Sequence, residues 1–301
     1  MEEYIGEHAS RIFYLAELNT EQIRSLDRDR TAVLIPGGIL EEHGPFLPCS
    51  TDTLGSEQLT SDLAGGILRR PEWSVLIFPP IPLGHGGANG IGGRDVFPGS
   101  YTVRATTLRA VFMDLASELG EQGFRWVFYL NHHFPPNEHN RALHQACAYF
   151  HDVYGGKMVH LMGLLDFSIL EGVMTAGDQK AVGMDIHAGA LETGWMLAFH
   201  PDLVDPAYEQ AVTQSGETWE DVVCLASVPD WPGYVGAPAL AKASYGTALA
   251  EKVSAAVIAL ALRILDGEDV DAAARNDRTP LQDLGWADRK QQEWLQKNGL
   301  K

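Results

Sequence analysis

Four short segments of the chain are apolar at almost every position, without the alternation of a strand that faces water on one side. Continuous apolar runs of this length, rich in β-branched and aromatic residues, are typical of strands that are covered on both faces. We therefore expect strands at residues 31–36, 74–78, 126–130 and 158–162.

Segments with helical spacing separate these runs. One of them places Leu108, Phe112 and Leu119 on the same side of a helix that Gly120 would end. Another helix is expected to begin near Asn19, which matches a capping box with the glutamine that follows three residues later. Longer helices are expected at residues 106–120, 137–154, 189–199 and 244–265.

The alternation of strands and helices predicts an α/β architecture, in which a mostly parallel sheet is flanked by helices. The chain carries no solenoid-type repeat and no linker rich in Pro, Gly or Ser. We therefore expect a single domain over residues 1–301.

Charge narrows the class of partner. The chain has 22 Lys and Arg against 40 Asp and Glu, a formal charge of −18. This balance is opposite to that of a nucleic-acid binder, and it disfavours an anionic membrane surface. Solubility is the simplest explanation of the acidity, so we expect neither nucleic acid nor membrane as partner.

The cysteines and the first residues of the chain indicate the cellular compartment in which the protein is expected. The three cysteines lie far apart and form no CxxC pair, which favours a reducing environment. Residues 1–10 lack the apolar segment of a signal peptide, and the longest apolar stretch, residues 255–262, is too short to span a bilayer. We expect a cytoplasmic protein.

A group of metal-ligand residue types follows the first strand. Glu41 and His43 are two positions apart, so in an extended segment they share a face, while Glu42 points elsewhere. Asp52 follows after a proline-stiffened turn. An imidazole and two carboxylates suit Zn²⁺, Mn²⁺ or Fe²⁺. The alternative is a solvated strand end with a hydrogen-bonded histidine.

The motif is also long enough to compare with known families. The pattern Glu-x-His-Gly-Pro-x-Leu-Pro followed by Thr-Asp, at residues 41–52, resembles the signature of the creatininase (creatinine amidohydrolase) family. Three later segments resemble that family in the same order: residues 131–137, 185–204 and 235–246. The resemblance covers residues 20–265 and implies a creatininase-like metal-dependent hydrolase.

The resemblance implies a set of ligands for two divalent metal ions, which would be Zn, Mn or Fe. Glu41 and His43 would bind metal, and Asp52 would bridge the two ions. The family's loop histidine corresponds to His133, with His132 as its neighbour and as the alternative.

The loop after the third expected run, residues 126–130, departs from the family pattern. It has one extra residue and carries Phe134, Pro135 and Pro136 in place of glycines. Pro135 stands where creatininase supplies a glutamate ligand, so the chain resembles a branch other than creatininase itself. The fifth ligand would then be Glu192, as in other branches, with Glu138 as the alternative.

Two residues lie near the expected start of the helix at residues 189–199. Glu192 falls in its first turn, where the helix dipole favours a carboxylate with or without a metal. His187 precedes the helix, and the resemblance implies that it shuttles a proton near the substrate. A histidine that caps the helix is the alternative.

Other candidates are less specific. The glycine-rich segment 84–93 lacks the features of a phosphate-binding loop, so it is a lid over the site or a plain surface loop. Trp231 and Tyr234 would wall a substrate pocket or belong to the core. A serine or cysteine hydrolase is disfavoured, because no GxSxG motif is present and no motif supports Cys49.

The function implied by the resemblance is hydrolysis of a small carbonyl compound, first a cyclic amide or an N-formyl C–N bond. The two ions would lower the pKa of a shared water molecule and so create hydroxide at neutral pH. The alternatives are a ring-opening C–C hydrolase that acts on an oxidised sugar or cyclitol, and a non-catalytic metal- or ligand-binding protein. The resemblance also implies a homo-oligomer, commonly a hexamer.

Overall fold

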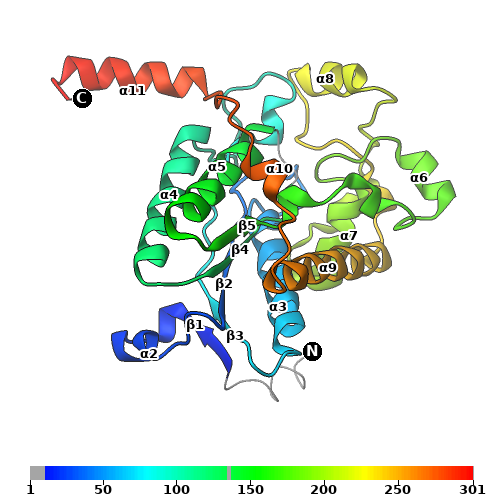
Figure 1. The fold of residues 1–301 in the computed structure, drawn as a ribbon. Coiled ribbons are helices and arrows are strands. Elements are labelled where there is room, and N and C mark those ends of the chain that lie inside the picture. The colour runs from blue at the N-terminus through cyan, green and yellow to red at the C-terminus, as the bar shows by residue number, and fades with distance from the viewer. Residues whose placement is uncertain (1–10, 134–136, 301) are drawn as a thin grey trace.

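The computed structural model describes residues 11–133 and 137–300. Its centre is a five-stranded, entirely parallel sheet with the strand order β1-β3-β2-β4-β5 (Figure 1). This confirms the parallel α/β sheet expected from the sequence. The strands are β1 (Ile12–Tyr14), β2 (Thr31–Pro36), β3 (Ser74–Ile77), β4 (Trp126–Leu130) and β5 (Lys157–His160).

Helices connect and cover these strands. The first, α2 (Thr20–Arg24), starts with the expected capping box, in which Asn19 and Gln22 exchange two hydrogen bonds. The longer helices are α3 (Thr51–Leu68), α4 (Ala105–Glu121), α5 (Asn137–Tyr154), α7 (Ala190–Phe199), α9 (Ala243–Leu265) and α11 (Gly285–Lys297). The shorter ones are α6 (Ala176–Val182), α8 (Trp219–Ser227) and α10 (Ala272–Arg275).

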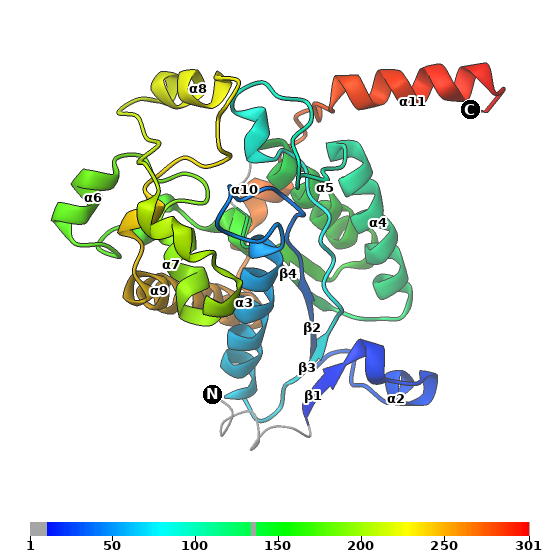
Figure 2. The same cartoon turned by 180° about the vertical axis from the view of Figure 1, so that it is seen from behind.

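The helices form a layer on each face of the sheet. Helices α4 and α5 lie on one side, and α3, α7 and α9 lie on the other (Figures 1 and 2). Leu34 and Phe128 belong to the core on the α3 side, whereas their neighbours Val33 and Val127 belong to the core on the α4 side. Burial on both faces explains why the strands are apolar at successive positions.

Two adjacent strands send their following segments to opposite layers. After β2 the chain passes to α3, and after β4 it passes to α5 on the other face (Figure 1). The two strand ends are level, because Pro36 pairs with Leu130 and Gly37 N donates to the Leu130 carbonyl at 2.7 Å. Such a switch point opens a crevice beyond the carboxyl ends of the strands, where ligands of α/β proteins bind.

The last helix, α11, extends away from the rest of the described chain and none of its residues is buried (Figures 1 and 2). In residues 11–133 and 137–300, no helix is long and apolar enough to cross a membrane.

Candidate metal centre

Glu41, His43 and Asp52 lie together at the carboxyl end of β2. The loop that carries the first two is closed by a hydrogen bond from Glu41 N to the Cys49 carbonyl at 3.1 Å. Asp52 falls in the first turn of α3, where the helix dipole favours its negative charge. All three side chains are almost fully buried, with exposures between 0% and 1%.

One group of candidate ligands consists of Glu41, Asp52 and His133, whose ligand atoms lie within 4.8 Å of one another. His133 follows β4, and its Nδ1 is 3.1 Å from Glu41 Oε2 and 3.3 Å from Asp52 Oδ2. The level ends of β2 and β4 therefore bring the first motif and the loop histidine to one point.

A second group consists of His43, His187 and Glu192, again with ligand atoms within 4.8 Å of one another. His43 Nε2 lies 3.9 Å from Glu192 Oε2 and 3.6 Å from Asp52 Oδ1. Asp52 thus lies between the groups, with Oδ2 toward His133 and Oδ1 toward His43. The two oxygens of Asp52 therefore face residues of different ligand groups.

Backbone carbonyls orient two of the imidazoles. His43 Nδ1 is 3.1 Å from the Glu41 carbonyl oxygen, so Nδ1–H donates there and Nε2 is the nitrogen that faces Asp52. His187 Nε2 is 2.6 Å from the Glu42 carbonyl oxygen, and its Nδ1 lies 3.8 Å from Glu41 Oε1. Each ring therefore turns its other nitrogen toward the candidate ligands.

Glu42 belongs to neither ligand group, as its place between Glu41 and His43 predicts, yet it is not exposed. It is 3% exposed, and its Oε1 lies 3.6 Å from His187 Nε2. Its Oε2 accepts a hydrogen bond from Gly44 N at 3.0 Å. Glu42 is therefore a buried neighbour of His187.

The start of α7 places Glu192. The Asp185 carboxylate accepts hydrogen bonds from Ala190 N and Leu191 N, both at 2.8 Å, and so caps the helix. Ala188 has a φ of 48°, a left-handed conformation that is costly for a residue with a side chain. Its N–H donates to Glu192 Oε2 at 2.5 Å. The backbone between His187 and α7 is thus held in a strained turn.

The structure also places the alternative ligands. Glu138 Oε1 accepts a hydrogen bond from Arg141 Nη1 at 3.1 Å, and Glu138 belongs to neither ligand group. His132 is buried with its ring 4.3 Å from that of Trp195, and it too is outside both groups. The insertion at residues 134–136, on which the departure from creatininase rests, lies outside the described residues.

The site fits divalent metal ions by its donor set and by its unsatisfied atoms. In the described part of the chain, Glu41 Oε2, His43 Nε2 and both oxygens of Asp52 are buried without a hydrogen-bond partner. Buried polar atoms that lack partners are costly, and buried carboxylates need positive charge nearby. Imidazole nitrogens and carboxylate oxygens are ligands that Zn²⁺ and Mn²⁺ accept.

The buried carboxylates of the site also favour positive charge on the groups around them. Burial and the neighbouring His187 both favour neutral His43, but Asp52 and Glu192 outweigh them and raise the pKa of His43 to about 9. Burial raises the pKa of Glu41, although the nearby histidines oppose this rise. Without metal, protons on histidines balance the carboxylates, and bound cations would take over that role.

A cavity of about 690 Å³ opens onto these ligands. Glu41, His133, His187 and Glu192 contribute to its wall. The glycine-rich segment contributes another part of the wall, through residues 86–88, 90 and 91. Because Ala88 N donates to Glu41 Oε1, this segment also holds a candidate ligand in place.

The two aromatic residues proposed from the sequence as pocket walls do not line this cavity. Trp231 is 3% exposed and packs in an apolar cluster with Val222 and Val235. Tyr234 is 4% exposed, and its hydroxyl donates to the Val212 carbonyl at 2.7 Å. Both are core aromatics, the other interpretation that the sequence allowed. Trp219 does line the cavity, although no sequence motif marked it.

A family model and individual relatives both match this chain over most of its length. The family model "Creatininase: Creatinine amidohydrolase" matches residues 16–261. Creatinine amidohydrolase of Pseudomonas putida is 27% identical over 187 residues, which make up 58% of this chain and 66%, just under two thirds, of that protein. The mycofactocin precursor peptide peptidase of Mycobacterium ulcerans (strain Agy99) is 28% identical over 201 residues, 64% of this chain and 68% of the relative.

Solved structures share the fold. A crystal structure of creatinine amidohydrolase (creatininase) matches with a TM-score of 0.63 and 21% identity, over 84% of this chain and 97% of that one. A putative creatinine amidohydrolase from Bacteroides fragilis NCTC 9343 matches with a TM-score of 0.62 and 20% identity, over 90% and 99%. Similar structures include a manganese form and a Zn-Zn form of creatininase, and one complex with creatine.

The resemblance and the fold predicted from the sequence are both confirmed by these matches. The metal forms among the similar structures, together with the two ligand groups of this chain, support a divalent-metal site. Because the family model spans well over half of its residues, the chain belongs to the creatininase family of metal-dependent hydrolases.

Proposed function

We propose that the protein hydrolyses a C–N bond of a neutral cyclic amide or N-formyl compound with two divalent ions, Zn, Mn or Fe. Glu41, Asp52 and His133 would hold one ion, and His43 and Glu192 the other, with Asp52 as the bridge. The observation that carries this proposal is the position of Asp52, whose two oxygens face two separate ligand groups.

Bound at these positions, the two ions would polarise the carbonyl group of the substrate and lower the pKa of a water molecule. The chain's own residues set the geometry. Glu41 and Asp52 come from the loop after β2 and the start of α3, and His133 comes from the end of β4, which the switch point places beside them. The apolar part of the cavity wall lowers the local polarity, which strengthens electrostatic contacts at the buried ligands.

His187 is the proposed proton donor to the departing nitrogen. Its Nε2 is anchored on the Glu42 carbonyl oxygen, so the proton that can be transferred is held at Nδ1, on the side of Glu41 Oε1. The cavity reaches this imidazole, as a general acid requires. His187 also meets the spacing of a third ligand beside His43 and Glu192, and metal analysis of a variant separates these roles.

The proposed substrate is not creatinine. Pro135 stands where creatininase supplies a glutamate ligand, and proline offers no side-chain group that could replace it. We therefore expect little or no creatinine turnover, whereas other lactams or formamides are cleaved.

The test is a panel of creatinine, lactams, formamides, short peptides and inososes, assayed with added Mn²⁺ or Zn²⁺. Cleavage of lactams or formamides, with creatinine poor, is the expected result. Robust creatinine hydrolysis would refute the departure from creatininase. Activity on inososes alone would make the enzyme a C–C hydrolase, and no activity on any compound by metal-loaded protein would favour a binding protein.

A further inference from the structure

The cavity beside the ligand groups has two kinds of wall. One wall carries the carboxylates and imidazoles, together with Asp185, whose charge is taken up by the N-terminus of α7. The rest of the wall consists of apolar side chains and glycine backbone. In the described part of the chain, no lysine or arginine lines the cavity.

The apolar wall begins directly beside the ligands. Leu191 precedes Glu192 on α7, and Leu249 comes from α9, which packs against α7. Leu191 is 8% exposed and Leu249 is 3% exposed, so both form part of the core as well as of the cavity. Leu170 extends this surface from the turn after β5. A substrate whose carbonyl lies at the ligands therefore meets aliphatic side chains next.

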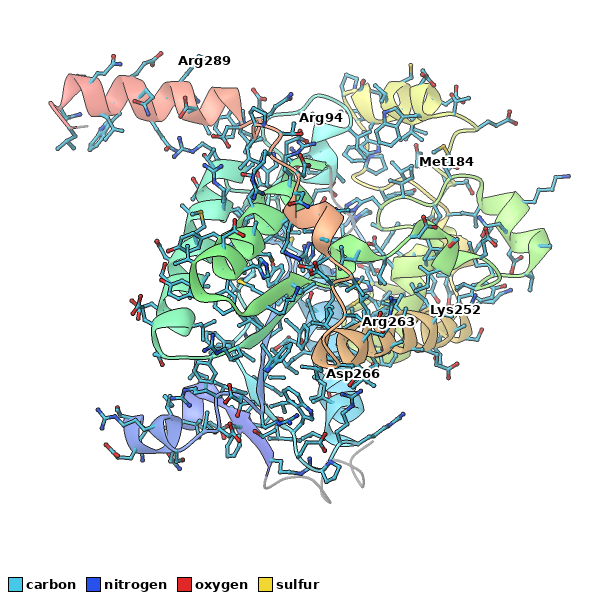
Figure 3. All side chains as sticks on the ribbon, viewed as in Figure 1. Arg94, Met184, Lys252, Arg263, Asp266 and Arg289 are labelled. Atoms are coloured by element: carbon cyan, nitrogen blue, oxygen red, sulfur yellow. The ribbon has the colours of Figure 1, made fainter. Side chains whose placement is uncertain are left out.

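Other apolar residues lie nearer the solvent. Trp219 is 50% exposed at the start of α8, and Ile186 is 37% exposed. Ile91 and Met184 are half-buried, and Met184 belongs to the segment that joins α6 to α7 (Figure 3). Apolar side chains thus continue from the buried end of the cavity to its exposed residues.

The cavity is larger and more apolar than a small polar lactam would require. At about 690 Å³ the cavity is in the range that encloses ligands of drug size. Polar atoms on a ligand that touched Leu170, Leu191 and Leu249 would lose their water without gaining a partner, whereas an apolar group gains from the same burial.

We propose that the cavity selects an uncharged substrate that carries an apolar group, a branched alkyl chain or an aromatic ring, on the nitrogen of its reacting amide. This inference names the substrate class of the same site and rests on the proposed function for the reaction. For an N-formyl compound, water adds to the formyl carbon and the C–N bond breaks. The nitrogen leaves with a proton as the amine, and formate is the other product.

The first experiment compares N-formyl compounds on metal-loaded protein. N-methylformamide, N-isobutylformamide and N-benzylformamide form a series of rising apolar size, and N-formylglycinamide is a polar compound of the size of the isobutyl member. We expect kcat/KM to rise about fourfold for each buried methylene, as the transfer of apolar surface implies. N-formylglycinamide should fall at least tenfold below N-isobutylformamide. Equal or better cleavage of N-formylglycinamide would overturn the apolar selection while leaving the hydrolase function intact.

A variant tests the wall itself. Met184→Lys places a cation at the cavity, and Val212→Lys places the same charge at a 70% exposed site that does not line it. Met184→Lys should lose at least tenfold in kcat/KM on N-benzylformamide and little on N-methylformamide, whereas Val212→Lys keeps wild-type values for both. Equal losses on both compounds, or none, in Met184→Lys would contradict the proposed contact.

A binding measurement tests the preference for an apolar group independently of the proposed hydrolysis. Benzylacetone and acetone are ketones without a C–N bond, and their binding to metal-loaded protein is measured by calorimetry. Benzylacetone should bind at least tenfold more tightly, with a negative heat-capacity change, even if no formamide is cleaved and the hydrolase proposal fails. Equal affinity for the two ketones would overturn the inference.

Discussion

His187 shows how much a single side chain depends on its neighbours. Its backbone pairs with Val235, its Nε2 is fixed on the Glu42 carbonyl oxygen, and its Nδ1 faces Glu41. Burial lowers the pKa of His187, but Glu41, Glu42 and Glu192 more than offset this and hold it well above its ordinary value. Because Nε2 is fixed on the carbonyl oxygen, Nδ1 is the ring nitrogen that can carry and release a proton beside the cavity.

Replacing this imidazole tests its role. His187→Ala should keep the fold and both metal ions and lose on the order of 10² or more in kcat, the usual scale for general acid-base catalysis. The matched control is His151→Ala, because His151 lies at the far end of α5 and contacts Gly156 instead of the ligands. A wild-type rate would remove His187 from catalysis, and loss of one ion would make it a ligand.

Sequence patterns indicated candidate ligands that the fold brings together, but they did not indicate the residues that form the cavity walls. Glu41, His43 and Asp52 could be recognised because metal chemistry requires particular side chains at a fixed spacing. Trp219 and Met184 could not, because an apolar residue has no chemistry of its own and lines a cavity only through the packing of distant segments.

At the scale of elements, the start of α7 determines the positions of His187 and Glu192 in the second ligand group. Gly236 lies against it with a φ of 150°, and a methyl group there would meet Asp185 Oδ1 at 2.1 Å and Gly189 Cα at 2.7 Å. The carboxylate that caps α7 would have to move. The positions of His187 and Glu192, on either side of that cap, would change with it.

Gly236→Ala should therefore lower both turnover and stability, by at least about 2 kcal/mol for a lost cap combined with backbone strain. The control is Gly177→Ala in α6, where an added methyl group meets nothing within 4 Å. That control should gain about 0.5–1 kcal/mol, as alanine does over glycine in a helix. Urea unfolding and steady-state kinetics measure both effects, and a fully active, equally stable Gly236→Ala would contradict this account.

The elements that sequence analysis missed have physical reasons. Helix α3 is buried between the sheet and α9, so its small and polar residues, such as Ser56, Thr60 and Gly66, face packed neighbours. A helix whose buried side includes small and polar residues shows no clear apolar stripe of helical period. Strand β1 has only three residues, which is too short for a pattern. The longer strands were recognisable because burial on both faces makes them uniformly apolar.

At the scale of the whole molecule, the layer of α5 encloses histidines that take no part in the ligand groups. In the described part of the chain, His144 Nε2 and both ring nitrogens of His160 are buried without hydrogen-bond partners. Burial lowers the pKa of His144 to about 4, and it lowers that of His160 well below its ordinary value. Both are therefore neutral in the folded protein near neutral pH.

Such groups bind protons more readily in the unfolded chain, so the free energy of unfolding must fall as the pH drops below the unfolded pKa of 6.5. From about pH 7 to about pH 5, His144 alone should account for a loss of about 2 kcal/mol. His144→Gln, which cannot titrate, should show a decline smaller by that amount in urea unfolding. Release of metal affects both proteins alike, and identical declines would show that His144 titrates normally.

In the proposed metal centre, the buried carboxylates and imidazoles hold two divalent ions, bridged by Asp52. The most direct test is the metal content of protein purified without chelator, measured by elemental analysis. We expect close to two divalent ions per chain, with both ions and the activity lost in Asp52→Asn. Glu57→Gln, which removes an exposed carboxylate from the same helix α3, should retain both. Wild-type protein that is free of metal and fully active would contradict the account.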